Sequence, residues 1–257
     1  MFSFGSLLKH KRPCRECAER ILPDDVPSSG NSDCECVDRT QIVQLCPCGL
    51  ARAAADSHPG FRRKGNEDSF AYHIDPERDL AILIVADGIG GSSDGDVASN
   101  YSVRTLLAAW RKFILRNSPG KNSVASFLRR ELERINRSLY EENLIGRRES
   151  PMGTTIAVLV LIPGCAVIAH AGDSRVYRCR EGALDLLTED HTLVANMIRT
   201  GEISKREAKT HPLSHVIYRS IGPTAHVSPT IRSFDRKCGD RYVVCSDGLT
   251  TEVEDSV

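Results

Sequence analysis

Residues 154–171 read TTIAVLVLIPGCAVIAHA, two apolar runs separated by Pro163 and Gly164 alone. A connection of two residues makes the flanking strands antiparallel neighbours, because parallel neighbours need a crossover of about a dozen residues or more. The first run has no polar residue from Ile156 to Ile162, which is typical of a strand buried in a core. The stretch therefore predicts a β-hairpin inside the protein.

Further strands and two helices surround this hairpin in the sequence. Short turn-forming segments separate several other runs with strand character, at residues 69–74, 80–86, 175–180, 183–187 and 241–245. Apolar residues recur at helical spacing over residues 97–115 and 124–144, with one apolar stripe on each segment. The pattern predicts an α+β domain in which a pair of helices covers one face of an antiparallel sheet.

The balance of charges excludes several classes of protein. The chain has 257 residues, with 34 Lys and Arg against 34 Asp and Glu, so its net charge is zero. Such a chain is not expected to bind nucleic acid or to anchor at a membrane through basic residues. No apolar run approaches the roughly 18 residues of a membrane span. We therefore expect a cytoplasmic monomer that acts without nucleic acid or membrane.

One segment departs from this balance. Residues 103–148 carry eleven Lys or Arg against four Asp or Glu, an excess of seven basic residues. Such a segment indicates either a solvated helix face or a docking surface for acidic partners.

Six of the ten cysteines lie in the first 48 residues, in a segment that shows little periodicity. They are Cys14, Cys17, Cys34, Cys36, Cys46 and Cys48. In a reducing compartment, paired thiols point to metal or redox chemistry before structural disulfides. Four of them would suffice for a tetrahedral Zn²⁺ site, which would stabilise a segment too short to build a core. Redox pairing and unligated thiols are the alternatives. We assign residues 1–55 to a Cys-rich leader, a candidate zinc-binding segment, and residues 56–257 to one folded domain.

Four short segments place carboxylates and glycines at the ends of predicted strands. They are residues 66–68, 87–91, 172–175 and 246–248. Any one of them would pass as a turn, but carboxylates gathered at one end of a sheet repel each other unless a cation lies between them. Hard oxygen ligands of this kind select Mg²⁺ or Mn²⁺ rather than Zn²⁺. The sequence therefore predicts a divalent metal site built from these segments.

The order and spacing of these segments resemble the metal-dependent serine/threonine protein phosphatases of the 2C type, most closely their bacterial branch. The matching motifs lie at residues 60–68, 85–91, 95–99, 152–155, 170–175, 187–191 and 245–249. The resemblance covers residues 56–257. It implies two packed antiparallel β-sheets flanked by helices, an αββα sandwich, which agrees with the hairpins predicted above.

The resemblance also implies which residues hold Mn²⁺ or Mg²⁺. Asp87 would bridge two ions, with the carbonyl oxygen of Gly88 as a further ligand. Asp247 would bind the first ion. Asp68, together with Glu67 through water, would hold the second.

Two further roles are implied by the resemblance. Asp173 and Asp247 would supply an optional third metal site, and Arg63 would grip the phosphate of the substrate. The reaction implied is hydrolysis of phosphoserine and phosphothreonine in proteins by a metal-activated water, with Asp87 and Arg63 as the catalytic residues. The expected substrates are proteins phosphorylated by a bacterial Ser/Thr kinase.

One feature of the family pattern has no counterpart in the sequence. Relatives have an Asp-Asn pair after the segment that matches 246–248, and its Asp is another metal ligand, but the 257 residues contain no Asp-Asn dipeptide. The domain is therefore expected to be incomplete at its C-terminal end. This leaves an alternative function, a catalytically impaired phosphatase-like module that binds phosphoproteins or regulates them. A zinc-dependent adaptor, in which the leader is dominant, is a further alternative.

Overall fold

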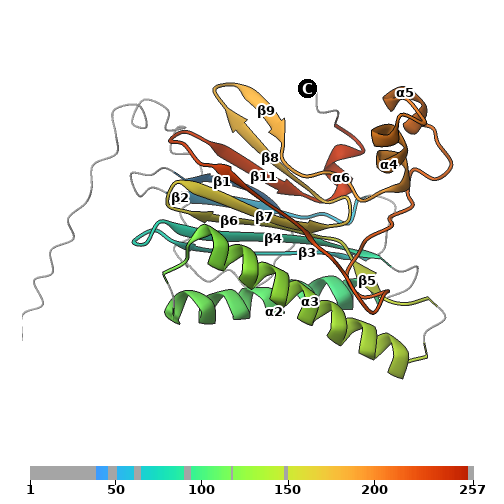
Figure 1. Cartoon of the computed structure of the whole chain (residues 1–257), viewed down its shortest axis with the longest axis horizontal. Coiled ribbons are helices and arrows are strands. Elements are labelled where there is room, and N and C mark those ends of the chain that lie inside the picture. Colours follow the sequence, from blue (N-terminus) through green and yellow to red (C-terminus); the bar gives the residue numbers. More distant parts are fainter. Residues whose placement is uncertain are drawn as a thin grey trace, which may run out of the picture.

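The computed structural model describes residues 39–45, 51–60, 65–89, 94–116, 118–147 and 150–253 (Figure 1). The strands are β1 (Arg39–Leu45), β2 (Ala51–Asp56), β3 (Asp68–Asp75), β4 (Leu80–Ile89), β5 (Gly153–Thr154), β6 (Ile156–Ile162), β7 (Cys165–Ala171), β8 (Arg175–Arg180), β9 (Ala183–Leu186), β10 (Thr230–Asp235) and β11 (Arg241–Cys245). The helices are α2 (Gly95–Arg116), α3 (Lys121–Ile145), α4 (Leu193–Thr200), α5 (Lys205–Ala208) and α6 (Asp247–Thr250).

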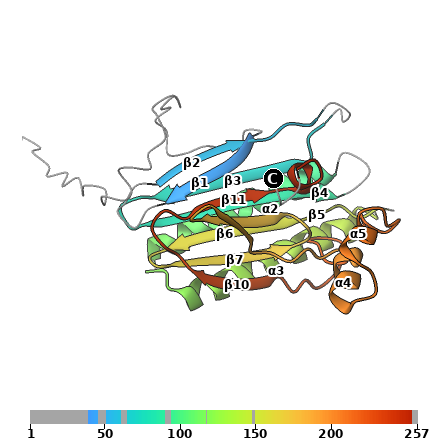
Figure 2. The same ribbon diagram turned by 90° about the horizontal axis from the view of Figure 1, so that it is seen from above.

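The strands form two antiparallel sheets that pack face to face. Sheet A has the order β2-β1-β11-β8-β9, and sheet B has the order β10-β7-β6-β4-β3, with the short β5 paired to β4. Seen from above, sheet A lies over sheet B (Figure 2). The predicted hairpin is β6 and β7, and Gly164 in its turn has a φ of 70°, a conformation that glycine adopts without strain.

The middle strands of sheet B face two cores at once. In β4, Leu83 and Val85 pack between the sheets together with Tyr242 of β11. The alternate residues Ile82 and Ile84 belong to the second core, between sheet B and the long helices. Because both faces of these strands are covered, their sequences are apolar throughout and do not alternate.

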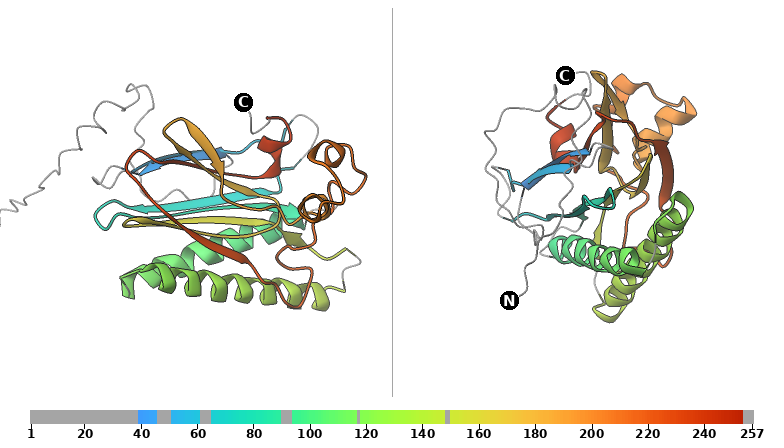
Figure 3. Two further views of the ribbon diagram at one scale, coloured as in Figure 1. Left: turned by 45° about the horizontal axis from the view of Figure 1, so that its top comes forward. Right: turned by 90° about the vertical axis from the view of Figure 1, so that its left-hand side faces the viewer.

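Helices α2 and α3 cover the outer face of sheet B (Figures 1 and 3). Each buries one stripe of side chains, and the wholly buried Trp110 of α2 packs on Phe127 of α3 with ring centroids 5.9 Å apart. The α+β sandwich with flanking helices is thus confirmed. Among the described residues, a second layer of long helices over sheet A is not seen, since α4 to α6 have eight residues or fewer. None of the described helices is long and apolar enough to cross a membrane.

The N-terminal boundary of the sheets differs from the prediction. Residues 1–55 were expected to form a leader, but β1 pairs with β11 and β2 pairs with β1, so residues 39–45 and 51–56 belong to sheet A. The apolar content of Arg39–Leu45 is too low to predict a buried strand from the sequence. The boundary predicted at residue 55 therefore falls inside β2, and the sheet begins no later than residue 39.

Candidate active site

Carboxylates from both sheets meet at one end of the sandwich. Asp68 is the first residue of β3 and lies opposite Asp87 of β4 in the strand register. Asp247 is the first residue of α6, which follows β11 of the other sheet. The hydroxyl of Ser246 donates a hydrogen bond of 2.8 Å to Asp68 Oδ2. This bond joins the two sheets at the point where the carboxylates gather.

The electrostatics show that these carboxyl groups oppose one another's ionisation. Burial, followed by the negative charges of Asp68 and Asp247 and hydrogen bonds with them, raises the pKa of Asp87 to about 9. Burial and then the charge of Asp247 raise the pKa of Asp173 to about 6. A carboxyl group behaves in this way when it is desolvated among other carboxylates. A cation placed among these groups would replace their repulsion with attraction.

This donor set fits a hard divalent cation. Carboxylate and backbone carbonyl oxygens are the ligands that Mg²⁺ and related ions prefer. In the part of the chain that the structure describes, no three His, Cys, Asp or Glu side chains are already drawn together as a metal site.

Two threonines hold the backbone at Asp87. Thr155 N–H and Thr154 Oγ1 both donate to the carbonyl oxygen of Asp87, at 2.8 and 2.9 Å. The N–H of Asp87 donates in turn to Thr155 Oγ1 at 3.0 Å. Both threonines are buried, so water does not compete for these bonds. The motif at residues 152–155 was noted in the sequence without a role, and the structure shows that it positions Asp87.

Gly88 allows the end of β4 to touch the start of α2. A Cβ atom at this position would lie 2.3 Å from the carbonyl oxygen of Gly95, so only glycine fits. The N–H of Gly88 donates to the carbonyl oxygen of Glu67 at 3.1 Å, and Ser99 Oγ donates to the same oxygen at 2.6 Å. Glu67 is therefore fixed through its backbone beside both Gly88 and the first turn of α2.

Asp173 is presented by a tight turn that is held at both of its ends. Gly172 has a φ of 112° and a Cβ there would meet the side chain of Thr155 at 2.6 Å. The N–H of Gly172 donates to His191 Nδ1 at 3.1 Å, and the N–H of His191 donates to the carbonyl oxygen of Gly172 at 3.0 Å. Ser174 Oγ lies 2.7 Å from Thr155 Oγ1. The turn thus shares Thr155 with the strand end that carries Asp87.

The segment at residues 187–191 holds the same turn through a second set of contacts. The guanidinium of Arg175 makes a two-pronged contact with Asp190, with Nη2 to Oδ2 at 2.6 Å and Nε to Oδ1 at 2.9 Å. Burial, followed by the adjacent His170 and then the positive charge of Arg219, lowers the pKa of His191 to about 3. His191 is therefore neutral near pH 7, and its Nδ1 is available to accept the bond from Gly172.

The family assignment follows from comparison with known proteins. A family model described as protein phosphatase 2C matches residues 62–257. The chain belongs to this family. The serine/threonine phosphatase Stp of Listeria welshimeri is 36% identical over 203 residues, which make up 76% of this chain and 79% of that protein.

Solved structures of 2C-type phosphatases have the same fold. The serine/threonine phosphatase of S. agalactiae has a TM-score of 0.69 at 28% identity, over 86% of this chain and 83% of that one. The catalytic domain of the phosphatase PstP in complex with 2 manganese ions has a TM-score of 0.65 at 29% identity, over 84% of this chain and 83% of that one. The protein is thus a serine/threonine protein phosphatase, and the alternative of an impaired binding module is not favoured.

Several residues predicted for this 2C-type phosphatase lie outside the described part of the chain. Arg63, Gly90 and Gly91 are among them, as are all six cysteines of the predicted leader, Cys14, Cys17, Cys34, Cys36, Cys46 and Cys48. The phosphate-binding role of Arg63 and zinc binding by the cysteines therefore stay predictions. The structure brings together Asp68, Asp87 and Asp247, with Asp173 close enough to Asp247 for their charges to interact.

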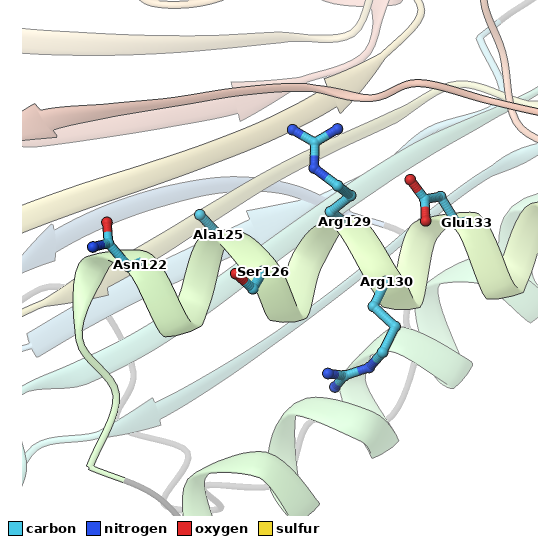
Figure 4. A pocket seen from close by; sticks show the side chains of 6 residues that line it. All are labelled: Asn122, Ala125, Ser126, Arg129, Arg130 and Glu133. Atoms are coloured by element: carbon cyan, nitrogen blue, oxygen red, sulfur yellow. The ribbon is translucent and has the colours of Figure 1, made fainter.

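A hollow on the outer face of α3 offers no comparable chemistry (Figure 4). Its volume is about 430 Å³, and one helix supplies all the residues that line it. The side chains of Arg129 and Arg130 point in different directions from this helix. Because no set of polar groups converges there, the carboxylate end of the sandwich is the candidate active site of the phosphatase.

Proposed function

We propose that this phosphatase hydrolyses phosphoserine and phosphothreonine in proteins with Mn²⁺ or Mg²⁺ ions held by the carboxylates around Asp87. The supporting observation is that burial, together with the negative charges of Asp68 and Asp247, raises the pKa of Asp87 to about 9. Buried carboxylates that repel one another in this way destabilise the fold unless a cation binds, so their presence on rigid strand ends favours a metal site.

The ligands are assigned to the ions as the family pattern suggests. Asp87 would help to hold both ions, with the carbonyl oxygen of Gly88 as a further ligand. Asp247 would bind the first ion, and Asp68, with Glu67 through water, would hold the second. Divalent ions at such a site supply positive charge for the phosphoryl oxygens and lower the pKa of water toward about 7.

The chain's own residues orient these groups and bind the substrate. Thr154 and Thr155 fix the backbone of Asp87, and the Ser246 hydroxyl directs one oxygen of Asp68. Asp173, whose turn His191 holds, adds with Asp247 a third and optional cation site. The guanidinium of Arg63 binds the substrate phosphate through two charge-assisted hydrogen bonds.

We further propose that the substrates are targets of a bacterial Ser/Thr kinase and that the chain acts as a cytoplasmic monomer. The kinase assignment is supported by the names of the bacterial relatives, which are serine/threonine phosphatases. Light scattering coupled to size-exclusion chromatography tests the oligomeric state, and a mass near 28.3 kDa is expected.

Hydrolysis of an aryl phosphate tests the metal-dependent reaction. Turnover by the purified chain is expected with Mn²⁺ and not with Mn²⁺ plus excess chelator. Asp87→Asn is expected to lower turnover by about 100-fold or more, because it removes a charge that holds both ions. The same variant should bind Mn²⁺ more weakly in calorimetric titration, which is a readout independent of turnover.

A matched control separates this effect from a general loss of carboxylates. Glu133→Gln makes the same change on the exposed face of α3, away from the carboxylate end, and should leave turnover and Mn²⁺ binding unchanged. Turnover that persists in chelator, or in Asp87→Asn, would contradict the proposal.

A further inference from the structure

A groove opens beside Asp68, between strand β3 and the first turns of α2. It has a volume of about 720 Å³, and its lining includes Asp68 and Ser69 from the strand and Asp96, Tyr101 and Arg104 from the helix. Asp68 is also one of the carboxylates grouped around Asp87. The groove therefore begins at the candidate active site and leads away from it along α2.

The shape of this groove suits an extended polypeptide. β3 is the last strand on its side of sheet B, so the groove follows a sheet edge. Edges of this kind are surfaces on which extended peptides dock in many complexes. Along the helix side, Val97 is 51% exposed and Tyr101 is 37% exposed, which gives apolar contact area for the side chains of a bound segment.

Arg104 is the cation of this groove. It is exposed, and the structure shows no ion pair between it and any other described residue. Arg104 follows Asp96 by eight residues, which corresponds to about 12 Å along the helix axis. An extended peptide covers about 3.3 Å per residue. These two lengths match when the bound peptide advances by three or four residues. If one peptide residue is bound beside Asp68, the peptide side chain three or four positions further along therefore reaches Arg104.

We propose that this groove holds the polypeptide that flanks the phosphorylated residue of a substrate protein. Arg104 selects substrates that carry Asp or Glu three or four residues from the phosphoserine or phosphothreonine. The inference rests on the proposed function, because it assumes that the phosphorylated residue binds at the carboxylate end. It adds a preference for acidic sequences that the carboxylate site alone would not provide.

Phosphothreonine peptides of otherwise identical sequence test this preference. They carry Asp, Ala or Lys at the positions three and four residues from the phosphothreonine, on one side or on the other. With the full chain and Mn²⁺, kcat/KM is expected to be about two- to fivefold higher for Asp than for Lys on one of the two sides, as is typical of an exposed ion pair.

The variant Arg104→Glu is expected to reverse this order, with Lys peptides turned over faster than Asp peptides. A gain on the Lys peptides also shows that the variant is folded. Arg129→Glu makes the same charge change on an exposed face of α3 outside the groove and should keep the wild-type preference (Figure 4).

Three results would overturn the inference, and they are distinguishable from one another. Equal kcat/KM for Asp and Lys peptides, in a chain that hydrolyses aryl phosphate with Mn²⁺, would refute the groove while leaving the proposed function intact. The same order of preference in Arg104→Glu as in the wild type would exclude Arg104 as its origin. A wild-type chain that hydrolyses neither aryl phosphate nor peptides would refute the proposed function and the groove together.

Discussion

The two ends of the β-sandwich hold carboxylates in opposite electrostatic surroundings. Asp79 directly precedes β4 (Leu80–Ile89) and Asp87 lies near the end of that strand. Asp240 directly precedes β11 (Arg241–Cys245), and Asp247 follows it by two residues. At the end with Asp87, burial and then the neighbouring carboxylates raise the pKa values of Asp87 and Asp173. At the end with Asp240, arginines sit against the acids instead. We call the first the carboxylate end and the second the ion-pair end.

The ion-pair end is neutralised by the chain itself. Arg180 binds Asp240 through two hydrogen bonds of 2.6 and 2.7 Å, and Arg236 binds Asp79. Burial alone would raise the pKa of Asp240, but the hydrogen bonds and charge of Arg180 hold it below its ordinary value. At the ion-pair end, arginines therefore neutralise the Asp residues, which stabilise the fold. At the carboxylate end, the Asp residues are available to bind a cation.

The largest expected contrast comes from the same substitution at each end. Asp240→Asn is expected to lower the free energy of unfolding by about 3 kcal/mol, because it leaves the guanidinium of Arg180 beside a neutral amide in a wholly buried site. Asp87→Asn in chelator is expected to leave stability unchanged or to raise it, because it replaces a carboxyl group whose ionisation is opposed by burial and by the neighbouring carboxylates. Urea unfolding of both variants without metal measures the difference.

A substantial loss of stability in metal-free Asp87→Asn would contradict this contrast. It would mean that the Asp87 carboxyl group stabilises the fold as Asp240 does. Equal stability of Asp240→Asn and the wild type would show in turn that the ion-pair end contributes little to folding.

The sequence predicted the parts of the fold that are buried on both faces. The hairpin of β6 and β7 was predicted from apolar runs, and the structure confirms it. β10 was not predicted, because Thr230–Asp235 is a half-exposed edge strand in which apolar and polar residues give no clear signal. β1 was missed for a related reason, since its pairing with β11 joins segments about 200 residues apart.

The candidate site was predictable as a set of carboxylates but not as an arrangement. Strand-end acids beside glycines are visible in the sequence, and so is their likeness to a family. Ser246 and Asp68 are 178 residues apart, and His191 is 19 residues from Gly172, so their hydrogen bonds depend on sheet packing and loop paths. The sequence motifs locate these residues but do not show which hydrogen bonds they form.

Acid titration should distinguish the two ends at different pH values. His191 lies near the carboxylate end, stacks on His170 with ring centroids 4.6 Å apart, and has a pKa lowered to about 3. The unfolded chain takes up a proton at this histidine below about pH 6.5, whereas the folded chain does not until about pH 3. The free energy of unfolding therefore falls as the pH drops through this window, by about 2 kcal/mol at pH 5.

His191→Gln should remove this part of the pH dependence. The glutamine amide can still accept the Gly172 N–H but does not titrate, so urea unfolding at pH 7 and pH 5 should give a smaller difference than in the wild type. The pKa of Asp240 is lowered, so its stabilisation is present above about pH 4 and is lost only as the pH falls further. An unchanged difference between pH 7 and pH 5 in His191→Gln would assign the pH dependence to other groups.

The smallest expected effect lies at the outer edge of the ion-pair end. Arg178 of β8 lies opposite Asp185 of β9 in the strand register, and its Nη2 is 2.7 Å from Asp185 Oδ2. The Asp185 side chain is 45% exposed, so water screens the pair and Asp185→Asn is expected to cost about 0.2–1 kcal/mol. Urea unfolding in 1 M NaCl should reduce this difference further, because salt screens exposed charges. If Asp185→Asn lowered the free energy of unfolding about as much as Asp240→Asn does, and salt did not change this loss, the strength of the ion pairs at this end would not depend on their burial.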